Sequence, residues 1–93
     1  LPLTQQQINK LRIIVCGLGR TGYKIFQLLK QQGAAVIGIS DRPIVSEYNQ
    51  QIIIGELRSA QTLINAGLKT AHTLVLVNDD DAINLAILTQ SRL

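Results

Sequence analysis

The stretch RIIVCGLGRTGYKIF, residues 12–26, decides the fold of this chain. A short run rich in β-branched residues leads directly into Gly17, Gly19 and Gly22 at the spacing GxGxxG, and a helical pattern of apolar residues follows. In such a turn, the first glycine permits the bend, the second lets the backbone approach a pyrophosphate, and the third lets the helix pack closely on the strand. The stretch therefore predicts a turn that binds phosphate on free amides at a helix N-terminus.

The remainder of the chain alternates strands with helices. We predict strands at residues 12–16, 35–39, 52–54 and 73–77. We predict helices at 20–32, 43–48 and 59–66, and a last helix that is capped by residues 78–81 and continues to the C-terminus. Residues 1–11 are glutamine-rich and form a linker or a short lead-in helix.

This alternation requires a parallel sheet. The predicted architecture is a Rossmann-like, doubly wound α/β fold with strand order 3-2-1-4, and it stops after the helix that follows the fourth strand. The fourth strand is then an open edge. Because open edges invite pairing, we expect self-association or contact with other parts of the native protein.

Composition limits the classes of function. The 93 residues make one domain, and a hydrophobic fraction of 46% with two tyrosines and one phenylalanine predicts an aliphatic core. The net charge of +3 is dispersed, and few aromatic side chains could stack on bases, so we expect no nucleic-acid partner. A single cysteine and the lack of a leader-like pattern favour a cytoplasmic location.

Several motifs together resemble the N-terminal lobe of the RCK family, also called the TrkA N-terminal (TrkA-N) or KTN domain. They are the glycine turn at 17–22, Gly-Glu at 55–56, Ala-Gly-Leu at 66–68, and Val-Asn-Asp-Asp-Asp at 77–81 followed by Asn-Leu at 84–85. The resemblance covers residues 12–93, as an incomplete nucleotide-binding lobe. It implies a cytoplasmic regulatory domain that controls a potassium channel or transporter at the inner face of the membrane. The membrane subunit is part of the same chain or a separate one.

The resemblance also implies dimers or larger rings, no catalysed reaction, and a bound nucleotide. NAD(H) is the expected ligand, with ATP, ADP or NADP(H) as alternatives. By this likeness the phosphates lie against the turn residues Gly17, Leu18, Gly19, Arg20, Thr21 and Gly22. The guanidinium of Arg20 is a planar fork of donors that suits phosphate oxygens. The alternative for Arg20 is a solvated side chain in the first turn of the helix.

The segment Ser40-Asp41-Arg42 follows the second strand, where relatives carry an acid that binds ribose. The spacing from Gly22 is 18 residues to Ser40 and 19 to Asp41, so counting does not choose between them. If Asp41 reaches the ribose, its carboxylate accepts from both hydroxyls and favours NAD, which is our preferred interpretation. If Ser40 and Arg42 point inward, they could hold a 2′-phosphate. Asp41 could instead cap the predicted helix at 43–48.

Two further positions complete the expected site. Family likeness puts Glu56 near the adenine, although relatives commonly carry aspartate there, and the alternative is an acid in the first turn of a helix. Asn78 ends the fourth strand and faces the crevice. The acids at 79–81 could attract a divalent cation, but three acids at a helix N-terminus are more typical of caps, so we predict no metal site. Cys16 is expected to be a buried small hydrophobe, and His72 to have no chemical role.

Two other classes of function share the glycine turn. A dehydrogenase fragment would show the same glycines, but an oxidoreductase also needs a proton donor and a substrate pocket, which this sequence does not supply. An oligomerisation module with an empty turn is the other alternative. We therefore expect a regulatory domain and not an enzyme.

Overall fold

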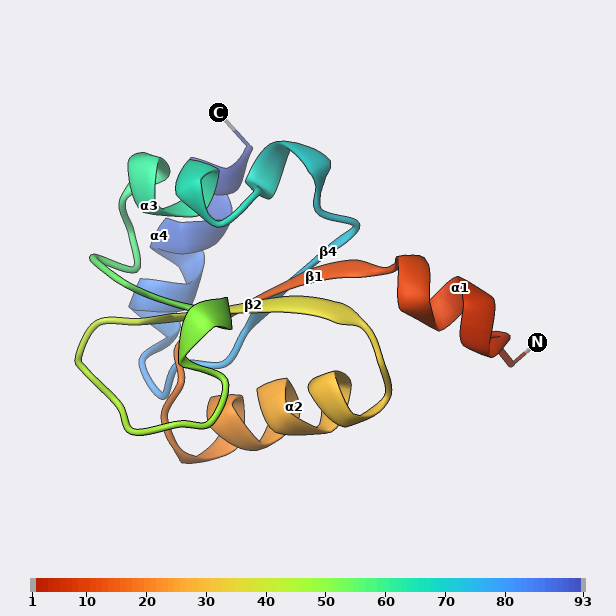
Figure 1. Cartoon of the computed structure of the whole chain (residues 1–93). Helices are drawn as coiled ribbons and strands as arrows, with labels where there is room; N and C mark the ends of the chain where they lie inside the picture. Colours follow the sequence, from red (N-terminus) through yellow and green to blue (C-terminus); the bar gives the residue numbers. More distant parts are fainter. Residues whose placement is uncertain (1, 93) are drawn as a thin grey trace.

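The computed structural model of this chain describes residues 2–92. Leu1 lies outside the described residues, as does Leu93, with which the predicted C-terminal helix ends. A four-stranded sheet forms the centre of the molecule (Figure 1), and its order β3-β2-β1-β4 confirms the prediction. All three pairs of neighbouring strands are parallel. The strands are β1 (Arg12–Cys16), β2 (Ala35–Ser40), β3 (Ile52–Ile54) and β4 (Thr73–Leu76).

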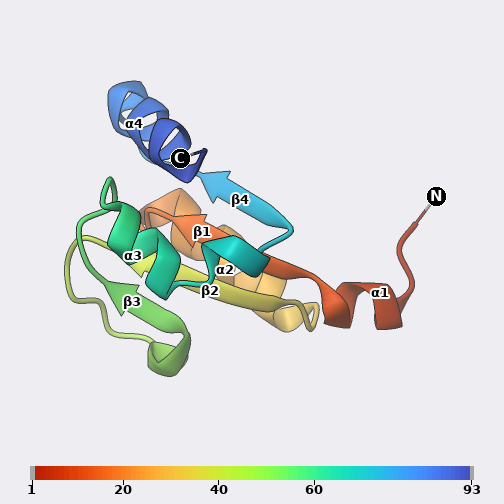
Figure 2. The ribbon, with the colours of Figure 1, turned by 90° about the horizontal axis from the view of Figure 1, so that it is seen from above.

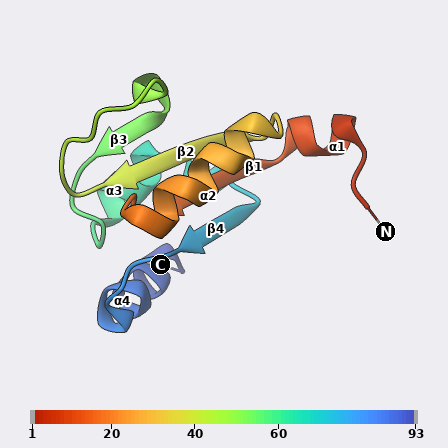
Figure 3. The ribbon, with the colours of Figure 1, turned by 90° about the horizontal axis from the view of Figure 1, so that it is seen from below.

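Helices cover both faces of this sheet. Within residues 2–92 the α-helices are α1 (Gln5–Lys10), α2 (Arg20–Gln31), α3 (Ala60–Asn65) and α4 (Asp81–Ser91), and short 3-10 turns form η1 (Asn49–Gln51) and η2 (Leu68–Thr70). Figure 2 shows α3 and α4 on one side of the sheet, and Figure 3 shows α2 on the other, whereas α1 extends beyond the sheet. Within residues 2–92 there is no helix with the length and apolar character that a membrane crossing requires.

The core consists of two apolar layers, one on each side of the sheet, because alternate residues of each strand face opposite sides. Val15, Val36 and Phe26 are buried between the sheet and α2. Ile14 and Ile87, with others, are buried on the opposite side, where α3 and α4 pack. The two layers keep the sheet, and therefore its carboxyl edge, in a fixed position.

The predicted helix at residues 43–48 is wrong. This segment is irregular, and η1 begins only at Asn49. The hydroxyl of Ser46 accepts the backbone N–H of Tyr48 at 3.0 Å and lies 2.7 Å from the hydroxyl of Tyr23 on α2. Because a serine side chain that binds the backbone locally competes with helical hydrogen bonds, these contacts favour a turn. The idea that Asp41 caps a helix here is wrong as well.

Candidate functional site

A cleft of about 550 Å³ lies at the carboxyl edge of the sheet. It lies between the glycine turn, the loop after β2 and the segment that joins β4 to α4. The residues that line it are Gly17, Leu18, Gly19, Arg20, Thr21, Ser40, Asp41, Arg42, Val77, Asn78, Asp79, Asp80 and Ile83. Nine of the eleven predicted site residues are among them, and Gly22 and Glu56 are the two that are not. The volume lies within the range typical of small-molecule sites.

The three glycines play different steric roles in the turn. Gly17 has a φ of +98°, which disfavours any other residue, and its N–H donates to the carbonyl of Ile39 at 2.9 Å. A Cβ at Gly22 would collide with the carbonyl oxygen of Gly17, so this glycine permits the close approach of α2. A Cβ at Gly19 would have no described heavy atom within 4 Å beyond its chain neighbours. Gly19 therefore faces open space in the cleft.

Several backbone amides at this turn are available to a ligand. Gly19 is the N-cap of α2 and has no side chain with which to cap it. The first hydrogen bond of the helix runs from the N–H of Tyr23 to the carbonyl of Gly19, at 2.9 Å. Across residues 2–92, no acceptor binds the N–H groups of residues 18–22. This arrangement suits an anion, because the donors and the positive end of the helix dipole coincide.

The hydroxyl of Ser40 forms hydrogen bonds within the loop that follows β2. Ser40 is 2% exposed, and its hydroxyl donates to the carbonyl of Arg42 at 2.6 Å while it accepts the N–H of Arg42 at 3.2 Å. Asp41 and Arg42 are exposed and form an ion pair at 3.5 Å. Asp41 and Arg42 therefore present charge to the cleft, whereas the Ser40 hydroxyl maintains the loop.

The opposite wall comes from the start of α4. Asp80 is the N-cap of this helix, and its Oδ1 accepts the N–H of Ala82 at 2.8 Å. The prediction of a capping role is thus confirmed for Asp80. The predicted site did not include four of the residues that line the cleft, which are Val77, Asp79, Asp80 and Ile83. Their position just after a strand of a parallel sheet was the available signal, because ligands bind outside the carboxyl ends of such strands. Within the part of the chain that is described, no three metal-ligating side chains come together.

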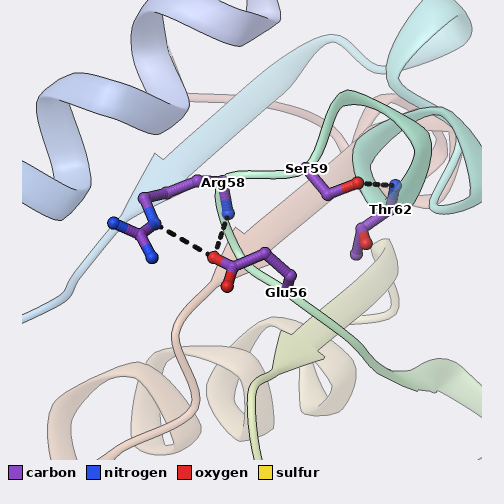
Figure 4. Close-up of polar contacts among 4 residues, drawn as sticks. All are labelled: Glu56, Arg58, Ser59 and Thr62. Atoms are coloured by element: carbon purple, nitrogen blue, oxygen red, sulfur yellow. Dashed lines mark hydrogen bonds and ion pairs between the residues drawn. The ribbon is translucent and has the colours of Figure 1, made fainter.

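Glu56 lies in a separate turn that leads to α3 (Figure 4). Its carboxylate accepts both the Nε of Arg58, at 3.0 Å, and the backbone N–H of Arg58, at 3.1 Å. These hydrogen bonds lower the pKa of Glu56 from its usual value. The N-cap of α3 is Ser59, whose hydroxyl accepts the N–H of Thr62, so Glu56 precedes the helix and the first-turn alternative is wrong.

Cys16 is buried in the core, and His72 binds the backbone of β1. Cys16 has no exposed surface, and burial raises the pKa of its thiol to about 12, which confirms the expectation of a buried small hydrophobe. The Nδ1 of His72 accepts the backbone N–H of Arg12 at 3.0 Å, and the N–H of His72 donates to the carbonyl of Arg12 at 2.8 Å. His72 thus joins β4 to the start of β1.

A comparison with known protein families matches the TrkA-N domain over residues 13–93. The chain belongs to the TrkA-N domain family. Comparisons with curated proteins and with solved structures found no match. TrkA-N domains in general bind dinucleotides and are regulatory, non-enzymatic domains of potassium transport systems. The family resemblance drawn from the sequence motifs is therefore confirmed.

The cleft of this TrkA-N domain divides its charges between its walls. Arg20 and the amides of the glycine turn supply donors on one wall, and Asp79 and Asp80 supply acceptors on the other. Asp41 adds an acceptor at the end of β2. The lining thus carries three acids and two arginines, so its charge is mixed. A ligand that carries phosphate at one point and hydroxyl groups at others would match both walls.

Proposed function

We propose that this TrkA-N domain is a cytoplasmic nucleotide sensor that controls potassium flux through a membrane channel or transporter. The observation that carries the proposal is the row of unbonded amides at residues 18–21, which line an open cleft opposite Asp79 and Asp80. The amides and Arg20 would bind phosphate oxygens through charge-assisted hydrogen bonds. The carboxylates would accept from ribose hydroxyls.

Within this proposal, NAD(H) is favoured over NADP(H). The Ser40 hydroxyl donates and accepts within its own loop, so it is not available to a 2′-phosphate. The exposed carboxylate of Asp41 would accept from a ribose diol and would repel a phosphate in its place. Asn78 would contact the ligand beside Gly17. No ligand contact is assigned to Glu56, because it does not line the cleft.

Regulation would arise from differential affinity. A nucleotide moves an assembly only if it binds one arrangement of the lobes more tightly than another. We propose that the domain forms dimers or rings at the inner face of the membrane, attached to the membrane subunit. Two features support self-association. β4 is an edge strand of the sheet, and Leu85 on α4 is 64% exposed.

Calorimetric titration of the domain with NADH, NAD, NADPH, ATP and ADP tests the proposal. We expect saturable binding of an adenine nucleotide without turnover, and tighter binding of NADH than of NADPH. Asp41→Asn should reduce this preference for NADH by about tenfold, because it removes a full negative charge that faces the 2′ position. Binding by none of the five compounds would reject the sensor and would favour an oligomerisation module. Oxidation of NADH once carbonyl compounds are added as hydride acceptors would favour an oxidoreductase.

A further inference from the structure

Asn84 lies outside the lining of the cleft, yet it binds Asn78, which is part of that lining. The backbone N–H and the Nδ2 of Asn78 both donate to Oδ1 of Asn84, at 3.1 and 2.9 Å. In return, Nδ2 of Asn84 donates to the carbonyl of Asn78 at 2.9 Å. These three bonds, which we call the asparagine clamp, close the loop that carries Asp79 and Asp80.

The clamp also reaches the glycine turn. Nδ2 of Asn78 donates to the carbonyl of Cys16 at 3.3 Å, at the end of β1. A Cβ at Gly17 would collide with Oδ1 of Asn78, so the asparagine side chain lies directly against this glycine. Asn84 is thus joined, through one side chain, to the turn that offers the phosphate-binding amides.

We propose that Asn84 is a positioning residue of the cleft, which acts through Asn78 to hold the start of α4 against the glycine turn. The inference rests on the proposed function, and it adds that occupancy of the cleft and the order of α4 are coupled. Without Asn84, the N–H, the carbonyl and the side chain of Asn78 lose partners at once. The loop at 79–81 then relaxes and the acidic wall loses its position.

The proposed coupling would extend from the cleft to exposed apolar side chains on α4. Ile83 lines the cleft and packs against the core layer that includes Ile87. Leu85 and Leu88 lie on the same helix and are 64% and 38% exposed. A ligand that tightens the asparagine clamp would therefore stabilise the helix that presents these apolar side chains to solvent.

The test compares Asn84→Ala with Asn65→Ala. Asn65 is a matched control, because it is also a helical asparagine whose Oδ1 accepts a hydrogen bond, from Gln61 at 2.8 Å, but its partner Gln61, unlike Asn78, does not line the cleft. We expect the dissociation constant for NADH to rise about tenfold in Asn84→Ala and to stay unchanged in Asn65→Ala. Asn84→Asp keeps the acceptor and loses the donor, so its affinity should be intermediate.

Hydrogen exchange supplies the second readout. In the ligand-free protein, Asn84→Ala should exchange faster at residues 78–84 than Asn65→Ala does. NADH should slow exchange along α4 in the wild type, and this protection should be lost in Asn84→Ala. If Asn84→Ala does not fold, Asn84→Asp takes its place in both measurements.

Unchanged NADH affinity and unchanged protection of α4 in Asn84→Ala would overturn the proposal, even if the melting temperature falls. If the wild type binds no nucleotide, the proposed function fails on its own. In that case, hydrogen exchange in the ligand-free protein tests the asparagine clamp by itself. Equal rates at residues 78–84 in the two variants would reject it, and faster exchange in Asn84→Ala alone would uphold it.

Discussion

Replacing Gly19 by alanine should separate ligand binding from folding in this domain. The added methyl group would have no described atom within 4 Å beyond the chain neighbours, and Gly19 has a φ of −72°, which alanine adopts freely. Alanine is a poorer N-cap than glycine by up to about 1 kcal/mol, but it lowers the entropy of the unfolded chain by about 0.4–1 kcal/mol. We therefore expect the free energy of unfolding to change by less than about 0.5 kcal/mol.

The same methyl group would project into the cleft, where a phosphate must approach the amides. Each charge-assisted hydrogen bond that it lengthens or removes is worth about 1.5–3 kcal/mol. The loss of one such bond weakens binding by about 10- to 100-fold. Gly19→Ala should therefore fold normally and bind nucleotide poorly.

Gly22→Ala provides the contrast. Its Cβ would collide with the carbonyl oxygen of Gly17 and would lie 2.9 Å from Cγ2 of Val77. The carbonyl belongs to a residue whose own N–H is bonded to Ile39, so the backbone cannot move aside easily. We expect a loss of about 3 kcal/mol in the free energy of unfolding.

Urea denaturation and calorimetric titration with NADH measure the two effects separately. Suppose that Gly19→Ala is as stable as the wild type and binds NADH with unchanged affinity. The phosphate would then not lie on these amides, and the reasoning from the open space at Gly19 would be refuted. A stable Gly22→Ala variant would refute the steric argument for the third glycine.

Three further results are expected. Arg20→Ala should weaken NADH binding about tenfold in calorimetry, and it should leave the urea midpoint unchanged because Arg20 is exposed. Equal affinity would show that Arg20 is a solvated side chain with no contact to phosphate. Ser46→Ala should lower the free energy of unfolding by about 1 kcal/mol in urea, since Tyr48 and Tyr23 lose a partner. Burial raises the pKa of the Cys16 thiol from 9.0 to about 12, so the folded state keeps a proton that the unfolded state loses in this window. The free energy of unfolding should thus fall as pH rises above about 9, by up to about 1.4 kcal/mol per pH unit, and less steeply in Cys16→Ala.

Local chemistry was sufficient to predict the architecture. The strand bounds agree with the prediction to within one residue, because β-branched runs and glycine stops restrict the backbone wherever they occur. Gly17 and Gly22 follow the same logic, since each is required by a steric condition that depends on its own backbone or on an adjacent turn, whereas a Cβ at Gly19 would meet no described protein atom within 4 Å beyond its chain neighbours. Alternation with helices predicted a parallel sheet, and the glycine turn after the first strand indicated the Rossmann-like order 3-2-1-4.

The hydrogen-bond partners of the polar side chains could not be predicted from the sequence, because they depend on residues distant in the chain or on the exact path of a loop. Ser40 and Asp41 were equivalent by spacing, and only the folded loop shows that the Ser40 hydroxyl is satisfied by Arg42. Ser46 prevents a helix partly through Tyr23, which is 23 residues away. Asn78 reaches Cys16 across 62 residues. Periodicity and residue type limit which conformations a segment adopts, whereas a hydrogen bond requires two atoms within about 3 Å, and packing of the whole chain sets that distance.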